Sequence, residues 1–330
     1  MKNSLKHVAS ESGFSIRTVK RALTGLGYVN EETRSKILEV VDRLAYRPNL
    51  TARALKTGRS CEMGVVLTSI DELHTEKLAG FEQALRREGY SVHVLFSPAE
   101  TGEADVPEVA NALMVRRPAG VALFPGPTAL ISGLTRRLAE LGVPHVLLDP
   151  RHDEPADTVR VDRPQGVYEA VMHMAGRGRG RIAYLGPAGD RSRLDGYERA
   201  MKALGRDPVV FAVHGPVEER ANVNAAAGAL LAAEPRPDAV QAYSDVTAMN
   251  LLAALHQRGI RVPEDVAVVG FDDRDFAALA WPRLTTVAQP NREVGAAAAE
   301  ILLGRVSAAP APDGGWSRTL PTRLVVRESA

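Results

Sequence analysis

The sequence predicts an α/β protein made of a small helical head and a larger body whose parallel sheets carry helices on both faces. Three observations lead to this prediction. The head region shows the periodicity of short amphipathic helices. Positive charge gathers in the first 60 residues. From residue 62 onward, apolar runs typical of strands alternate with helical stretches, which is the pattern of parallel strands joined by crossover helices.

Length and composition place the chain among globular proteins with more than one domain. It has 330 residues, of which 45% are hydrophobic and 25% are charged. It has no apolar run long enough to span a bilayer, and its polar start, MKNSLKHVASESGF, lacks the apolar core of a signal peptide. The single cysteine, Cys61, rules out an intrachain disulfide framework. We therefore expect a cytoplasmic protein with no membrane partner.

Charge is distributed unevenly along the chain. Residues 1–60 hold 12 Lys and Arg against 5 Asp and Glu, a net charge of +7, whereas the rest of the chain carries −6. A basic head on a mildly acidic body suggests a polyanionic partner for the head. On charge alone, a membrane surface and simple solvation stay open as alternatives.

The head fits three helices. Ser4 can cap a first helix, which Gly13 ends, and Ser15 can cap a second, which stops near Gly25. Asn30 can cap a third helix, EETRSKILEVVDRLAY. Two short helices joined by a glycine-containing turn and braced by a third form a helix-turn-helix unit.

The second helix, SIRTVKRAL, carries charge on one side only. Ile16, Val19 and Leu23 share one face at helical spacing. The opposite face is polar and cationic, and it comprises Arg17, Lys20, Arg21 and Thr24. An ordinary solvated helix would show the same pattern. In a helix-turn-helix unit, however, the second helix enters the major groove of DNA, so we interpret the apolar face as packed and the cationic face as the DNA-binding side.

Head, hinge and body motifs follow one another in a familiar order. The segments LKHVASESGFSIRTVKRALTGLGYVNEETRSKILEVVDRLAYRPN, ARALKTGRS and the C-terminal LPTRLVVRES carry the likeness, which covers nearly the whole chain. In these segments the chain resembles the LacI/GalR family of bacterial transcription regulators. The resemblance implies a helix-turn-helix head and a hinge helix, followed by a two-lobed, periplasmic-binding-protein-like effector domain with parallel sheets.

The resemblance assigns DNA contacts to matching positions of the head. Ile16 and Arg17 begin the recognition helix, where bases are chosen, and Ser15 and Thr18 contact phosphates. The head residues implied in DNA binding are Ser15, Ile16, Arg17, Thr18, Lys20, Arg21, Thr24 and Tyr46.

Two of these positions depart from the family pattern. Lys20 stands where the family usually has Ser, and Thr24 stands where it usually has Asn. A lysine brings charge and a longer reach, so that it can meet a phosphate or a guanine edge. We hypothesise that Lys20 shifts operator preference.

A hinge follows the head. Pro48 disfavours helix at the preceding residue, a short helix fits residues 50–56, and Gly58 ends it. A helix of this length is unstable alone in water. The resemblance implies that it orders on DNA beside the hinge of a second protomer, with Leu55 wedged into the minor groove, although an ordinary linker hydrophobe is the alternative. The hinge residues implied in DNA binding are Asn49, Ala52, Arg53 and Leu55.

The body alternates strands with helices. The predicted strands are 63–69, 91–96, 120–124, 145–149, 181–186, 209–213, 239–243 and 266–271, and clear helical stretches are 76–89 and 245–259. We expect two lobes, roughly 62–160 and 161–290, with a late crossover of the chain. The predicted domain boundaries are 1–47 for the DNA-binding head, 48–61 for the hinge, and 62–330 for the effector-binding and dimerisation domain.

Ligands of open parallel sheets bind beyond the carboxyl ends of the strands, so we expect the effector there. The resemblance points to Arg193 in DRSRLDGYERAM and to Asp272 in VVGFDD, a pair that suits a polyhydroxyl or heterocyclic ligand. Ser244 and Asp245 stand where the family usually has an Asn-Asp pair, and for Asp245 a helix N-cap role is equally open. Candidates chosen only because they lie at loop ends, where a cap would look the same, are Thr68, Asp71, His74, Phe124, Asp149, Asp162 and Asn291.

Enzyme signatures are weak in this sequence. GRGRGR at 176–181 looks like a dinucleotide-binding fingerprint, but it follows a helix and precedes a strand, the reverse of the required order. Neither an HExxH metal motif nor a GxSxG nucleophile elbow occurs. We therefore expect no catalytic residues, no cofactor and no metal.

Together these patterns predict a cytoplasmic, nucleoid-associated homodimer. It would repress transcription by binding a pseudo-palindromic operator in double-stranded DNA, under the control of a small-molecule effector such as a sugar or a related metabolite. A metabolite-modifying enzyme and a nucleobase-responsive, co-repressor-type regulator are the alternatives.

Overall fold

The structure is a computed structural model in which residues 5–24, 28–44, 46, 60–98, 102–150, 154–215, 220–308 and 316–330 are described. Contacts along the chain divide it into two compact units, between Cys61 and Glu62. We call them the head and the effector unit. The predicted hinge helix lies outside the described residues, as do its implied DNA-binding residues Asn49, Ala52, Arg53 and Leu55. No helix in the described part of the chain is long and apolar enough to cross a membrane.

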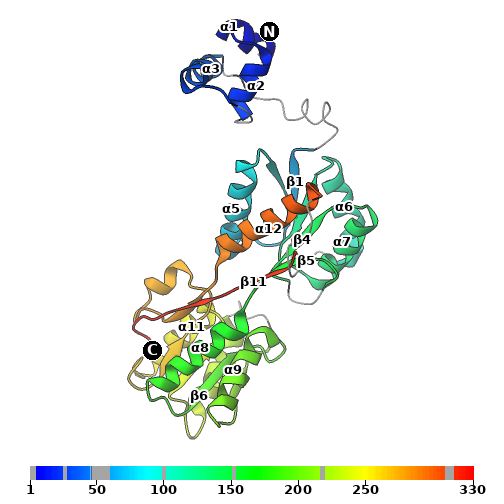
Figure 1. The fold of residues 1–330 in the computed structure, drawn as a ribbon. Coiled ribbons are helices and arrows are strands. Elements are labelled where there is room, and N and C mark those ends of the chain that lie inside the picture. The colour runs from blue at the N-terminus through cyan, green and yellow to red at the C-terminus, as the bar shows by residue number, and fades with distance from the viewer. Residues whose placement is uncertain are drawn as a thin grey trace. The chain divides into compact units, whose positions relative to one another are not determined.

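Three helices form the head: α1 (Leu5–Ser12), α2 (Ile16–Thr24) and α3 (Glu31–Arg43) (Figure 1). The sequence predicts all three, and their apolar sides enclose a small core around the fully buried Val8, Val19 and Ile37. Two predicted caps are confirmed. Ser15 Oγ accepts a hydrogen bond from the first turn of α2, and Asn30 Oδ1 accepts one from the first turn of α3 at 2.8 Å.

One expectation for α2 is wrong. Ile16 does not belong to the packed face, because 44% of its surface is exposed, and the buried residues of α2 are Val19 and Ala22. Helical side chains lean toward the N-terminus of their helix, so the side chain of the first residue extends past the packed turn. Ile16 therefore lies on the accessible side of the head, where the family pattern places it.

The effector unit contains most of the secondary structure. Its strands are β1 (Glu62–Leu67), β2 (Ser91–Phe96), β3 (Gly120–Leu123), β4 (His145–Leu148), β5 (Asp157–Val161), β6 (Ile182–Gly186), β7 (Val210–Ala212), β8 (Ala239–Ala242), β9 (Ala267–Val269), β10 (Thr286–Ala288), β11 (Arg318–Leu320) and β12 (Arg323–Val325). Its helices are α5 (Glu72–Arg87), η1 (Glu103–Asp105), α6 (Val106–Met114), α7 (Thr128–Glu140), α8 (Arg163–Gly176), α9 (Arg191–Ala203), α10 (Arg220–Ala232), α11 (Asp245–Gln257), η2 (Asp275–Ala278) and α12 (Asn291–Val306).

These elements form two lobes, each with a parallel sheet between helices. The first lobe has the strand order β11-β5-β4-β3-β1-β2 and the second has β7-β6-β8-β9. Alternate residues of a strand face opposite cores. In β1, Val65 packs toward α5 and α12, whereas Val66 packs toward α6 and α7. In β6, Tyr184 packs toward α8 and α9, and Leu185 toward α10 and α11.

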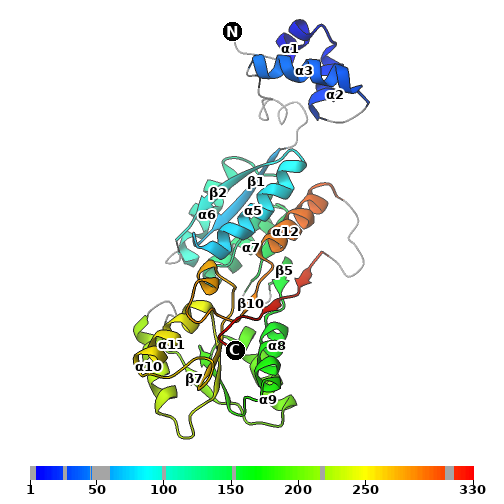
Figure 2. The ribbon, with the colours of Figure 1, turned by 90° about the vertical axis from the view of Figure 1, so that its left-hand side faces the viewer.

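The chain crosses between the lobes three times. It leaves the first lobe after β5 and returns after β10 to form α12 and β11, then leaves again to form β12 (Figure 2). Helix α12 consequently lies beside α5, although the two are far apart in sequence (Figure 1). The eight predicted strands all correspond to observed strands, whereas β5, β10, β11 and β12 were not predicted.

Close packing of α5 against α12 depends on two glycines. A Cβ atom added to Gly80 would lie 2.0 Å from the carbonyl oxygen of Arg292, and one added to Gly295 would lie 1.9 Å from that of Lys77. Real Cβ atoms do not approach backbone oxygens so closely, and neither oxygen is the end of a flexible side chain. The absence of side chains at these two positions sets the distance between the helices.

We therefore expect Gly295→Ala to lower the free energy of unfolding by about 1–3 kcal/mol, the usual cost of overpacking, as measured by urea denaturation. Gly228→Ala in α10 is the matched control, because an added Cβ there meets no atom within 4 Å. It should be neutral, or should stabilise the protein by about 0.5–1 kcal/mol through the higher helix propensity of alanine. Equal unfolding midpoints for the two variants would contradict this account of the packing.

Candidate ligand cleft and DNA-facing helix

A cleft of about 780 Å³ lies between the lobes, at the carboxyl ends of the strands. This volume is in the range of small-molecule sites. Four helices begin at the cleft, and their N-cap residues line it: Asp71, Asp162, Asp190 and Ser244. Each cap side chain accepts a backbone hydrogen bond from its own first turn, at 2.9–3.2 Å. The positive ends of four helix dipoles therefore point toward the cleft.

Seven of the predicted effector residues come together in this cleft. They are Asp71, His74, Asp149, Asp162, Arg193, Ser244 and Asp272. They belong to both lobes, and they come from loops and helix starts that are distant in sequence.

Arg193 and Asp272 form a buried ion pair, with 3.2 Å between Nη2 and Oδ1. The guanidinium lies between two rings, with its Cζ 4.2 Å from the centroid of Tyr243 and 4.4 Å from that of Phe271. Gln289 donates a further hydrogen bond to Asp272, at 2.6 Å. Rings on both sides and a carboxylate at its end leave this arginine little freedom to move.

A second ion pair, between the buried Asp149 and the partly buried Arg163, joins the two lobes. Asp149, which follows β4, accepts hydrogen bonds from both terminal nitrogens of Arg163, the first residue of α8. Burial by itself raises the pKa of Asp149, but the charge and hydrogen bonds of Arg163 more than offset it, so the net pKa is lowered. Arg163 also donates to Gln289 Oε1 at 3.1 Å. Gln289 thus links the two ion pairs, and we call the chain Asp149–Arg163–Gln289–Asp272–Arg193 the cleft network.

Lys77 is a cleft residue that sequence reasoning missed. It lies on α5 with only 3% of its surface exposed, and its Nζ donates to Asn291 Oδ1 at 2.7 Å. Burial lowers its pKa. A signal for it does exist in the sequence, because Lys77 occupies the same helical face as the buried Phe81 and Leu85. Arg163, Tyr243, Arg274 and Gln289 also line the cleft and were not predicted.

Four predicted effector residues do not line the cleft. Thr68 donates its hydroxyl to the carbonyl oxygen of Pro125 at 2.5 Å, and Asn291 lies behind Lys77. Asp245 is fully buried, accepting hydrogen bonds from Thr286 Oγ1 at 2.5 Å and from the backbone of Arg274 at 2.8 Å. Its carboxylate is fully used in holding the loop that carries Arg274.

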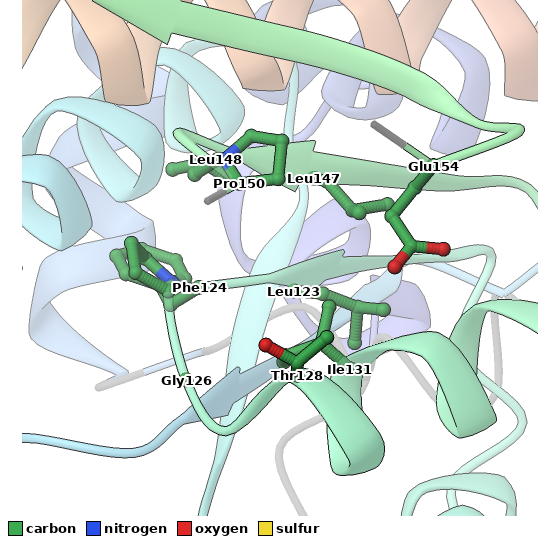
Figure 3. A pocket seen from close by; sticks show the side chains of 10 residues that line it. Leu123, Phe124, Gly126, Thr128, Ile131, Leu147, Leu148, Pro150 and Glu154 are labelled. Atoms are coloured by element: carbon green, nitrogen blue, oxygen red, sulfur yellow. The ribbon is translucent and has the colours of Figure 1, made fainter. Parts of the chain in front are cut away.

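The fourth, Phe124, lines a separate small pocket beyond β3 and β4 (Figure 3). Figure 3 shows Phe124 and Pro150 on one side of this pocket, and Glu154 with Thr128 of α7 on the other. The Glu154 carboxylate accepts a hydrogen bond from Ser132. The cavity measures about 20 Å³, which is room for roughly one water molecule and not for an effector.

In the head, α2 presents a cationic surface. Arg17 and Lys20 are exposed, and Thr18 donates its backbone N–H to Ser15 Oγ at 3.1 Å. Tyr46 is mostly buried in the head core, and this burial raises its pKa. Thr24 is the last residue of α2, and Arg21 is partly exposed.

Among the described residues, no three His, Cys, Asp or Glu side chains gather in the manner of metal ligands.

Comparisons with known proteins agree across the whole chain. A family model for bacterial regulatory proteins of the lacI family matches residues 4–49, and one for a periplasmic binding protein-like domain matches residues 171–330. The HTH-type transcriptional repressor PurR of Vibrio atlanticus is 31% identical over 318 residues, 92% of each chain. The HTH-type transcriptional regulator RegA of Clostridium saccharobutylicum is 30% identical, with the same coverage. The solved complex of the transcriptional regulator CelR with cellobiose has a TM-score of 0.69 at 27% identity, covering 99% of this chain and 100% of that one.

Asp245 gives this unit a testable pH dependence. Burial raises the pKa of its carboxyl to about 7. Between about pH 4 and pH 7 the folded state therefore holds a proton on Asp245 that the unfolded state has lost, so the contribution of this one group to the free energy of unfolding decreases as pH rises through that interval. In the wild type we expect Asp245 to lower the free energy of unfolding by about 2 kcal/mol between pH 5 and pH 7. In Asp245→Asn this decrease should be absent.

The control is Asp265→Asn. The pKa of this exposed carboxyl is lowered to about 2 by its hydrogen bonds from Arg261, so it does not titrate in that interval. Urea denaturation at several pH values compares the slopes. A wild-type slope that persists in Asp245→Asn would show that another group causes it.

Proposed function

Because the chain belongs to the LacI family of bacterial regulatory proteins, we propose that it is a repressor that binds a pseudo-palindromic operator as a homodimer and responds to a small-molecule effector in its cleft. As a family member it is a transcriptional regulator with an effector-binding domain. The observation that carries the DNA-binding part is the exposed cationic side of α2, opposite the buried Val19 and Ala22.

In this proposal α2 lies in the major groove. Arg17, Lys20 and Arg21 face the bases and backbone, while the hydroxyls of Ser15 and Thr18 meet phosphates. Two heads on one dimer read two half-sites, and the paired hinges, through Leu55, kink the central minor groove. Because phosphate contacts release counterions, operator affinity falls steeply as salt concentration rises.

The effector would act through contacts between the lobes. Asp149 and Arg163 pair across the cleft, and the backbone N–H of Asp275 in η2 donates to Glu72 of α5 at 3.0 Å. A ligand that bridges the lobes changes the free-energy difference between their open and closed arrangements. This in turn changes the spacing of the two heads in a dimer. Coupling of this kind is typically about 1–3 kcal/mol and acts reciprocally on DNA and effector.

A sugar-like metabolite suits this cleft better than a nucleobase does. Two aromatic rings are among the described lining residues, and each already has a neighbour: the Arg193 guanidinium covers a face of Tyr243, and His74 stacks on Phe124 with 6.3 Å between ring centroids. A nucleobase is usually held by stacking on open ring faces. The structurally similar CelR was solved with cellobiose, which is consistent with a carbohydrate-type effector here.

Exposed apolar side chains support the homodimer. Strand β2 is an edge strand of the first sheet, and Val94 and Phe96 on it are 39% and 47% exposed. In the second lobe, Leu279 and Trp281 are 84% and 91% exposed. Unpaired edges and large exposed apolar residues are typical of surfaces that pair with another chain.

We expect Val94→Lys to weaken the dimer at least about tenfold, because it places a charge in a desolvated interface. Sedimentation velocity over a range of protein concentrations measures the change. Val210→Lys is a closely matched control: Val210 lies on β7, the edge strand of the other sheet, and is 37% exposed. If both variants remain dimeric, β2 is not the interface.

Random-oligonucleotide selection tests the DNA-binding function directly, and we expect a palindromic consensus. Lys20→Ser should change the ranking of half-sites, because each good base contact contributes about 1–3 kcal/mol of discrimination. Lys36→Ser is the control, because it makes the same change on α3, outside the recognition helix, at a lysine whose Nζ is paired with Glu32 at 2.8 Å. It should leave the ranking unchanged.

Fluorescence anisotropy on the selected sites quantifies both variants. A Lys20→Ser protein with the wild-type ranking would refute the specificity role of Lys20. A wild-type protein without any sequence preference at moderate salt would refute the repressor proposal itself.

A further inference from the structure

We propose that the effector carries an anionic group, a carboxylate or a phosphate, which Arg274 and Lys77 bind from the two lobes of the cleft. This inference rests on the proposed function, because it names the chemical class of ligand for the same site. Three features of the cleft carry it: carboxylate oxygens that are mostly occupied, cationic groups that retain unused donors, and a positive field from the starts of the surrounding helices.

The carboxylates of the cleft are already engaged by the protein. Asp71, Asp162 and Asp190 cap helices, and Asp190 accepts a further hydrogen bond from the Tyr243 hydroxyl at 2.7 Å. The two carboxylates of the cleft network hold arginines. In the described part of the chain, eight of the ten carboxylate oxygens of these five residues accept a hydrogen bond, and the two that do not are Oδ2 of Asp162 and Oδ2 of Asp272. A ligand rich in hydrogen-bond donors therefore finds two open carboxylate oxygens here.

The cationic groups, in contrast, retain unused donors. Within the described part of the chain the Arg274 guanidinium makes no hydrogen bond: its Nε is 3.9 Å from Asp272 Oδ2, and that Nε is buried without a partner. Arg193 Nε is likewise buried without a partner. Lys77 uses one of its three ammonium protons, on Asn291. The terminal nitrogens of Arg274 and two ammonium protons of Lys77 therefore remain as donors, and an anionic ligand supplies acceptors for them.

The local electric field of the cleft also favours an anion. The charged side chains that line it nearly balance, because six Lys and Arg face five Asp and one of the six, Arg191, is paired with Asp195 and Glu198. The N-termini of α5, α8, α9 and α11 add positive potential at the same place. Burial also lowers the pKa of Lys77, and a bound anion would oppose that effect by stabilising the charged form.

Arg274 and Lys77 are well placed to act together. Arg274 follows β9 in the second lobe, whereas Lys77 lies on α5 in the first, and both line the cleft. Asp71 lies at the start of α5, close enough to Arg274 that the positive charge of this arginine helps to lower the pKa of the Asp71 carboxyl. An anion between the two cations would draw the lobes together, and this gives the effector a direct means of favouring the closed arrangement.

Thermal unfolding of the full-length protein without DNA tests the proposal. Sodium phosphate, sodium malonate and the neutral polyol xylitol are each added at about 10 mM, with ionic strength held constant by sodium chloride. We expect phosphate or malonate to raise Tm by about 3 °C once its concentration is tenfold above its Kd, and xylitol to have no effect. The probe that acts distinguishes a phosphate-bearing from a carboxylate-bearing effector.

Arg274→Gln should weaken oxyanion binding by about tenfold or more, whereas Arg191→Gln should leave it unchanged. Arg191 is the matched control because it lines the same cleft, yet its guanidinium is held by Asp195 and Glu198, both at 2.6 Å. General salting-out by these ions acts equally on both variants, so the difference between them isolates the cleft. If Arg274→Gln does not fold, Lys77→Met, which should show the same loss, replaces it.

The proposal is overturned if neither oxyanion stabilises the protein beyond chloride, or if Arg274→Gln responds as the wild type does. Anisotropy with the selected operator, on the same preparations, separates this outcome from a failure of the proposed function. Specific DNA binding without an oxyanion response refutes the anionic effector alone. An oxyanion response without specific DNA binding refutes the repressor proposal and leaves the cleft assignment in place.

Discussion

The cleft depends on one constraint: a carboxylate withdrawn from water must be paired. Asp149 and Asp272 are both nearly fully buried, and an unpaired buried charge would cost several kcal/mol. Each is paired with an arginine of another segment, and Gln289 accepts from one arginine and donates to the opposite carboxylate. If one member is removed, a charge is left unpaired in a low-dielectric environment. The members of the cleft network therefore depend on one another.

The position of this network explains how the cleft can act as a switch. Arg163 and Gln289 lie at two of the places where the chain crosses between lobes, and Asp149 and Asp272 end strands of different sheets. A change in the angle between the lobes must therefore lengthen or rebuild these bonds. Because both carboxylates are buried, an intermediate arrangement would leave them without their partners, which favours two discrete states over a continuous motion.

Sequence reasoning recovered the parts of the fold that rest on local patterns. Long apolar strands, amphipathic helices and caps such as Asn30 can be predicted from short stretches of sequence, because each depends on neighbouring residues. The strands β10, β11 and β12 are three residues long, and β11 is an exposed edge, so they carry too little apolar signal. β5 has five residues, and its sequence DTVRV mixes charged with apolar residues. Their pairing is dictated by chain crossings that no local window contains.

The same limit applies to the cleft. Arg193 and Asp272 follow recognisable motifs, but their partner Gln289 is adjacent only because the chain returns to the first lobe after β10. Lys77 lies on the apolar face of α5, so its position signals a buried lysine, but the helical pattern does not show that this face reaches a cleft. Asp245 is the opposite case, a residue of a ligand-binding motif that does not line the cleft. Its carboxylate accepts hydrogen bonds from Thr286 and from the backbone of Arg274 instead.

A motif therefore identifies residues near a ligand without showing which of their hydrogen-bonding groups are still available. Arginine and aspartate together suggest a ligand that both donates and accepts, such as a sugar ring. Arg193 and Gln289 both donate to Oδ1 of Asp272, so only Oδ2 of this carboxylate is left to accept from a ligand. The donors of Arg274 and Lys77, which the motif does not name, therefore contribute to specificity beside it.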